Sequence, residues 1–79
     1  MKNLAKQLGA NIRDKRKEQG IPQERLALEC GVDRSYMGRI ERGKVNITVD
    51  KLYQIAAKLN CEPASLLPLS EARPSDKQS

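Results

Sequence analysis

The stretch QERLALECGVDRSYMGRIERG, residues 23–43, predicts two short helices separated by a turn of only three residues. The apolar stripe of the first helix stops at Gly31, and Asp33 is a suitable N-cap for the second. Helices joined so closely cross at a steep angle, so the residues at their closest approach must be small. Ala27 supplies that small side chain, and Gly31 can adopt the left-handed backbone that the turn requires. The helix pair is closed by the apolar residues Leu26, Cys30, Val32, Met37 and Ile40.

Amphipathic patterns also precede and follow this pair of helices. Apolar residues recur every four positions within residues 4–19, which predicts a first helix that ends at Gly20. Thr48 is a suitable N-cap for a further helix with one apolar side, and Pro63 starts a short fifth helix that ends near Pro68. The sequence shows no strand-like alternation and no internal repeat. The predicted fold class is therefore all-α, with five helices in one compact unit.

The length of the chain limits its organisation. A chain of 79 residues buries about 60 to 65% of its unfolded surface, which suffices for a single core. We expect one domain over residues 1–69, and the polar composition of SEARPSDKQS predicts a flexible C-terminal tail over residues 70–79. No apolar run approaches the roughly 18 residues of a membrane span, and no signal segment follows Met1. We therefore expect a cytoplasmic protein that does not contact a membrane.

The net charge of +5 lies in the front half of the chain. Residues 1–44 carry eleven Lys and Arg against six acidic residues, whereas residues 45–79 carry four of each. The front half is a candidate surface for a polyanion. A solvated, lysine-rich helix surface is the alternative, and charge alone does not choose between the two. An aromatic content of 3% argues against stacking platforms for single-stranded nucleic acid.

The residues that usually carry catalysis or bind metals are scarce. Cys30 and Cys61 are accompanied by no histidine, so no familiar metal-ligand spacing is present. Cys30 falls on an apolar helical face, which favours a small buried hydrophobe over a disulfide. Ser35 has no base to activate it, and no nucleophile elbow or Gly-rich phosphate loop occurs. We expect no enzymatic activity, no metal, no cofactor and no small-molecule ligand.

Residues 23–43 resemble the helix-turn-helix of the Cro/CI-like (XRE) family of bacterial and phage regulators. Each position where that motif needs a glycine, a small residue or an apolar residue is filled accordingly. The resemblance extends over residues 4–67 and implies a lambda-repressor-like DNA-binding domain with double-stranded DNA as its partner. It also implies that the third helix lies in the major groove.

The resemblance assigns roles to individual side chains. The residues that it places against the bases are Arg34, Ser35, Gly38 and Arg39. The residues that it places against the DNA backbone are Gln23, Tyr36, Arg42 and Lys44. It pairs Arg16 with Glu41 as a structural ion pair that holds the third helix. Arg34 and Arg39 are the strongest base-reading candidates, because an Arg fork reads guanine bidentately. A phosphate contact for one of the two arginines, and a half-buried ring for Tyr36, remain open.

Gly38 raises a separate question, because glycine within a helix costs about 1 kcal/mol relative to alanine. On a helix pressed into a groove, a missing side chain lets the backbone approach a base pair closely. The alternative is a tolerated accident.

The segment DRSYMGRIERGKVNIT followed by DKLYQIAAKLNCEPASLL is similar to the controller proteins of restriction-modification systems. These are short helical homodimers that bind palindromic operators and regulate their own operon. Val45 stands where many relatives carry a basic or polar residue, so the resemblance leaves a loop contact with DNA there open. A chromosomal or prophage repressor, and an antitoxin or adaptor that binds a protein, remain alternatives. Contact with RNA polymerase remains open.

A single third helix reads only about four or five base pairs, so we expect two copies to act together across a two-fold axis. The interface should avoid the basic half, where like charges would meet. The residues expected to form it are Tyr53, Leu66, Leu67 and Leu69. The alternative is that Leu66 and Leu67 complete the core of the monomer and Leu69 begins the tail.

Overall fold

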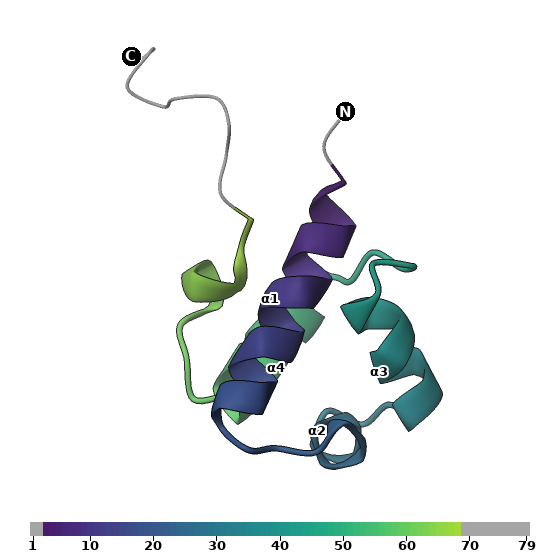
Figure 1. Cartoon of the computed structure of the whole chain (residues 1–79), viewed down its shortest axis with the longest axis vertical. Coiled ribbons are helices and arrows are strands. Elements are labelled where there is room, and N and C mark those ends of the chain that lie inside the picture. The colour runs from purple at the N-terminus through teal and green to yellow at the C-terminus, as the bar shows by residue number, and fades with distance from the viewer. Residues whose placement is uncertain (1–2, 69–79) are drawn as a thin grey trace.

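The computed structural model describes residues 3–68 of the chain. It contains the α-helices α1 (Leu4–Glu18), α2 (Gln23–Glu29), α3 (Arg34–Glu41) and α4 (Val49–Lys58), followed by the 3-10 helix η1 (Pro63–Leu66) (Figure 1). Residues 3–68 contain no strand, so the all-α class is confirmed. Leu69 and the tail expected over residues 70–79 lie outside the described residues.

The predicted fifth helix is wrong in type, because residues 63–66 form a single 3-10 turn. Leu67 adopts an extended backbone with φ −73° and ψ 143°, and Pro68 follows it directly. A proline disfavours the α conformation of the residue before it, and its ring removes a backbone donor. The sequence therefore stops the helix after one turn.

Side-chain caps begin three of the four α-helices. The carboxylate of Asp33 accepts from the backbone N–H of Tyr36 at 2.7 Å, and the Thr48 hydroxyl accepts from the N–H of Lys51 at 3.0 Å. Both of these caps are confirmed, and Asn3 caps α1 in the same way. Each cap satisfies a backbone donor that has no partner within the helix.

The core lies where the apolar sides of the helices meet. α3 packs against α1 and α2, while α4 packs against α2 and η1. Figure 1 shows α3 at one side of α1 and η1 at the other. The buried apolar residues are Ile12, Leu26, Ala27, Cys30, Met37, Ile40, Leu52, Ile55, Ala56, Leu59 and Leu66. This core fixes the angle at which α3 meets the rest of the domain.

Polar side chains from neighbouring elements bind the carbonyl oxygens at the C-terminal ends of α2 and α4. Lys51 on α4 donates from Nζ to the Cys30 carbonyl oxygen at the end of α2, at 2.9 Å. Gln19 donates from Nε2 to the Leu59 carbonyl oxygen after α4, also at 2.9 Å. The last carbonyls of a helix have no partner within it, so these side chains act as C-caps supplied from a neighbouring element.

Cys30 is buried with a free thiol, and Cys61 is half-buried and also free. Burial raises the pKa of the Cys30 thiol above its ordinary value, so Cys30 remains protonated and unreactive at neutral pH. No helix among the described residues combines the length and the apolar character that a bilayer crossing requires. Residues 3–68 also hold no group of three or more side chains suited to a metal ion.

Candidate nucleic-acid interface

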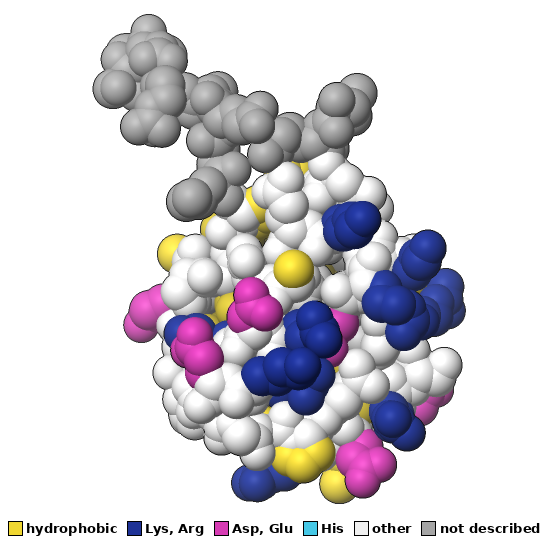
Figure 2. Space-filling view, in the orientation of Figure 1, with side chains coloured by type: hydrophobic (Ala, Val, Ile, Leu, Met, Phe, Trp, Pro, Cys, Tyr) yellow, Lys and Arg dark blue, Asp and Glu magenta, His cyan; other side chains and the backbone are white. Residues whose placement is uncertain are grey.

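The exposed side of α3 carries polar and cationic side chains. Arg34, Ser35 and Arg39 are exposed, while Met37 and Ile40 face the core. This division follows the 3.6-residue period of the helix. Figure 2 shows Lys and Arg side chains gathered over the side of the molecule on which α3 lies. Three of the expected base-reading residues therefore occupy one accessible helical face.

An open depression of about 450 Å³ lies between the exposed side of α3 and the start of α2. The residues that line it are Gln23, Arg34, Ser35, Gly38 and Arg42. Two guanidinium groups, an amide and a hydroxyl thus converge from two elements that are separate in the sequence. All four side chains can donate hydrogen bonds to an anion or to acceptors on a base edge.

Gly38 is buried beneath the side chains of the same depression. A Cβ atom at Gly38 would lie 3.1 Å from Nη1 of Arg42 and 3.7 Å from the amide of Gln23. The missing side chain therefore leaves room for these two groups to lie against α3. In the free chain these two side chains lie beside Gly38, and the contact of its backbone with a base pair stays a prediction.

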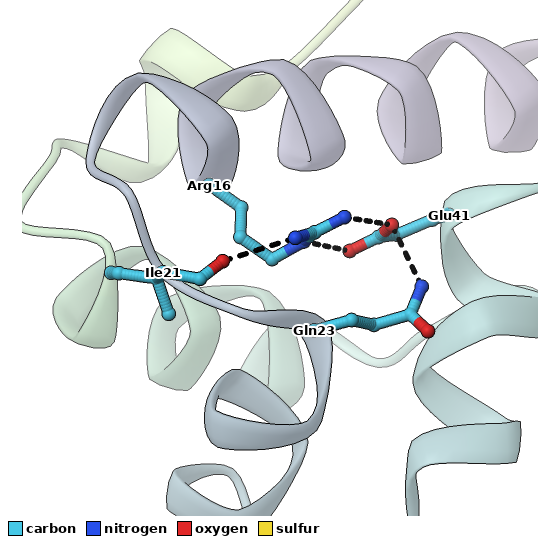
Figure 3. A network of polar contacts seen from close by, with 4 residues as sticks. All are labelled: Arg16, Ile21, Gln23 and Glu41. Carbon is cyan, nitrogen blue, oxygen red and sulfur yellow. Dashed lines mark hydrogen bonds and ion pairs between the residues drawn. The ribbon is translucent and has the colours of Figure 1, made fainter.

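A buried polar network joins α1, α2 and α3 behind this surface (Figure 3). Arg16 donates from Nε to Oε2 of Glu41 at 2.8 Å and from Nη2 to Oε1 at 3.1 Å. The expected ion pair is therefore present. It is shielded from solvent, because the side chains of Arg16 and Glu41 are only 11% and 3% exposed. Arg16 also donates from Nη1 to the Ile21 carbonyl oxygen at 3.0 Å. One guanidinium thereby holds a helix, a loop and the end of α3 together.

Gln23 completes this network, and sequence reasoning did not foresee its part. Its Nε2 donates to Oε1 of Glu41 at 3.0 Å. Because an ionised carboxylate only accepts hydrogen bonds, the amide nitrogen must face Glu41. The amide oxygen then points away from Glu41, as Figure 3 shows. The start of α2 is thus fastened to the end of α3 by a side chain that the resemblance assigned only to the DNA backbone.

The other expected backbone contacts differ in their surroundings. Arg42 and Lys44 are exposed just after α3. The Lys44 N–H donates to the Arg39 carbonyl oxygen at 2.9 Å, which fixes the backbone after the turn at Gly43. Tyr36 is half-buried against the core, as in the alternative stated above, and its contact with DNA stays a prediction.

The structure separates the residues expected at a dimer interface. Tyr53 and Leu67 are exposed, by 60% and 48%. Leu66 is fully buried, so its assignment to the interface is wrong: the η1 turn directs this side chain into the core. The Leu66 carbonyl oxygen also accepts from Nδ2 of Asn11 at 2.9 Å. Leu69 lies outside the described residues, and exposed Val49, one turn before Tyr53, was not foreseen.

Comparisons with known proteins agree with this arrangement. Residues 12–66 match the family model described as Helix-turn-helix. The chain is 35% identical over 66 residues to the Control protein C.BamHI of Bacillus amyloliquefaciens, which covers 82% of each chain. The crystal structure of the restriction-modification controller protein C.AhdI from Aeromonas hydrophila superposes with a TM-score of 0.76 at 36% identity, over 80% of this chain and 91% of that one. The master regulator for biofilm formation SinR, solved in complex with DNA, superposes with a TM-score of 0.69 at 33% identity, over 75% of this chain and 95% of that one.

Proposed function

The chain belongs to the helix-turn-helix family of XRE-type transcription regulators, and we propose that it is a controller protein of a restriction-modification system. In this proposal a homodimer binds a palindromic operator in double-stranded DNA and regulates the operon that encodes it. Such a protein acts in the cytoplasm, where the operator is, and needs neither a cofactor nor a catalytic site.

The exposed face of α3 is the observation that carries the DNA-binding part of the proposal. Arg34 and Arg39 project from this face without an ion-pair partner among the described residues. A guanidinium fork in the major groove donates to O6 and N7 of guanine, and each such pair discriminates by about 1–3 kcal/mol. Ser35 lies between them and can donate to, or accept from, a neighbouring base edge. In this proposal these three side chains read the sequence.

Contacts with the DNA backbone surround this face. Arg42 and Lys44 are exposed after α3, and Gln23, at the start of α2, lines the depression together with Arg42. Gln23 keeps one N–H on Nε2, because the other is donated to Glu41. Phosphate contacts of this kind fix the register of a protein on the duplex without reading its sequence. Tyr36 completes the proposed set from its half-buried position.

The dimer is proposed to form through the second half of the chain, in which positive and negative charges balance. Tyr53 on α4 and Leu67 after η1 are exposed apolar residues that lie outside α2 and α3. An isologous interface of this kind places two copies of α3 about 34 Å apart, one turn of DNA, so a two-fold symmetric protein meets a palindromic site.

Selection of bound duplexes from a random DNA pool tests the proposal in one experiment. We expect a palindromic sequence whose half-sites lie about one helical turn apart. Arg39→Ala should relax the preference at one base pair per half-site, because a bidentate reader worth about 1–3 kcal/mol is lost. Lys44→Ala is the matched control: it should weaken binding to every duplex alike and reduce the salt slope by about one unit.

Three results would contradict parts of this assignment. If no sequence is enriched from the pool, the proposed sequence-specific DNA binding is contradicted, and an adaptor that binds protein is favoured. An enriched but non-palindromic site would remove the dimer. A uniform loss for Arg39→Ala across all duplexes would move Arg39 from the bases to a phosphate.

A further inference from the structure

A second depression adjoins the one described above and extends it to α1. It encloses about 360 Å³, and the residues that line it are Arg13, Gln23, Gly38, Glu41 and Arg42. Gln23, Gly38 and Arg42 also line the first depression, so the two are neighbours on one surface. Arg13 is the contribution of α1, and neither the resemblance nor the sequence patterns gave it a role.

The charge of this depression is positive despite Glu41. Both carboxylate oxygens of Glu41 accept from Arg16, and one also accepts from Gln23, so its charge is already matched. Arg13 and Arg42 form no ion pair within residues 3–68. Two uncompensated guanidinium groups therefore border one hollow, from α1 and from the end of α3.

The position of Arg42 depends on Gly38. The terminal Nη1 of Arg42 lies close to the backbone of Gly38, 3.1 Å from where a Cβ atom would be. The end of the Arg42 side chain thus lies back over α3 beside the hollow, while the residue as a whole stays exposed.

We propose that Arg13 and Arg42 together bind one phosphate of the DNA backbone in this depression, so that the DNA footprint includes α1. The inference rests on the proposed function, because it assumes a duplex seated on α3. A helix in the major groove, which is about 12 Å wide, has a phosphate backbone on either side. Side chains that flank the helix, as these two do, then meet phosphates and not bases. Guanidinium forks match phosphate oxygens bidentately, which suits this ligand.

The test compares Arg13→Ala with Lys58→Ala, which removes one exposed positive charge from α4 instead. Binding is measured over a range of salt concentrations, on the duplex enriched by selection and on a random duplex. We expect Arg13→Ala to reduce the salt slope by about one unit on both duplexes and to leave the selected sequence unchanged. Arg13→Lys should keep most of the slope, because the charge remains. Arg13 is exposed and unpaired, so the unfolding midpoint should not move.

The outcomes separate this inference from the function on which it rests. A wild-type chain that binds no duplex would overturn the proposed function. A wild type that binds normally, with Arg13→Ala no weaker than Lys58→Ala, would overturn the phosphate site alone. A change in base preference at one position would also overturn it, because Arg13 would then read a base.

Discussion

Glu41 is the acidic residue to which both neighbouring helices are attached. Its carboxylate is almost fully buried and accepts three hydrogen bonds, two from Arg16 and one from Gln23. A buried charge of this kind contributes little net stability while it is paired, but leaving one partner alone is costly. The network therefore favours the arrangement in which α2 and α3 keep a fixed angle, which the proposed DNA contacts require.

Removing Arg16 should expose this dependence. Arg16→Ala leaves Glu41 buried with only Gln23 as a partner, so we expect a loss of about 3–5 kcal/mol in the free energy of unfolding, measured by urea titration. Arg25→Ala is the control, because Arg25 pairs with Glu29 on the open surface of α2 at 3.2 Å. Its loss should stay below about 0.5 kcal/mol. Equal losses in the free energy of unfolding for the two variants would show that the buried network contributes no more to stability than a surface ion pair.

Sequence reasoning reached part of this network and missed the rest for a physical reason. The pairing of Arg16 with Glu41 came from the resemblance, since 25 positions separate the two residues and no local pattern links them. Gln23 lies 18 positions from Glu41, and a glutamine at a helix start has several plausible partners. Its bond to Glu41 follows only from the angle at which α2 meets α3, which tertiary packing decides.

At the scale of helices, α1 and α3 approach each other closely at Gly9. A Cβ atom there would overlap the carbonyl oxygen of Ile40 and lie 2.6 Å from that of Glu41. The turn after α3 is equally tight, because a Cβ at Gly43 would overlap the backbone of Lys6, and Gly43 has φ +75°. Only glycine both leaves room for the Lys6 backbone and readily adopts a positive φ at this position. The two positions bring α3 against α1 without intervening side chains.

Two glycine-to-alanine variants should therefore have opposite effects on stability. Gly9→Ala inserts a methyl group against rigid backbone, and we expect a loss of about 1–3 kcal/mol. In Gly38→Ala the tight contact, at 3.1 Å, is with the end of the flexible Arg42 side chain, so the helix propensity of alanine should raise stability by up to about 1 kcal/mol. DNA affinity should fall in Gly38→Ala, because Arg42 is displaced. Thermal unfolding and duplex binding, measured on both variants, check these signs.

A loss of stability in Gly38→Ala would mean that the Arg42 side chain cannot move aside. An unchanged stability in Gly9→Ala would mean that α1 can shift away from α3. The sequence could not distinguish these glycines, because both lie within helical patterns. What differs is the neighbour, a backbone carbonyl in one case and a side-chain tip in the other. By contrast, the caps at Asp33 and Thr48 are local features, and they were predictable for that reason.

At the scale of the whole molecule, the two halves of the chain differ in net charge, while both carry exposed apolar residues. The basic side chains of the first 44 residues include those around α3, whereas the second half is neutral. Exposed apolar side chains in this second half include Val49, Tyr53 and Leu67. Val49 and Tyr53 are four residues apart on α4 and so share one helical face. This distribution suits a protein that binds a polyanion with one part and a second copy of itself with another.

The proposed dimer can be tested by placing charge on this apolar surface. We expect Leu67→Glu and Tyr53→Glu to sediment as folded monomers, because two carboxylates would face each other across the two-fold axis. Leu28→Glu is the control: Leu28 is an exposed leucine on α2, outside the proposed interface, so this variant should remain dimeric. The monomers should still bind DNA weakly, without preference for a palindrome, since one copy of α3 reads only about four or five base pairs.

The two substituted positions are exposed, so loss of the dimer can be distinguished from unfolding in this experiment. Leu66 is buried, so a charge there would unfold the domain, whereas Leu67 and Tyr53 are open enough to accept a carboxylate without loss of the core. Circular dichroism should therefore report the same helix content for both variants as for the wild type. A double variant that remains dimeric would place the interface elsewhere on the molecule. A variant that unfolds would instead show that Leu67 completes the core of the monomer.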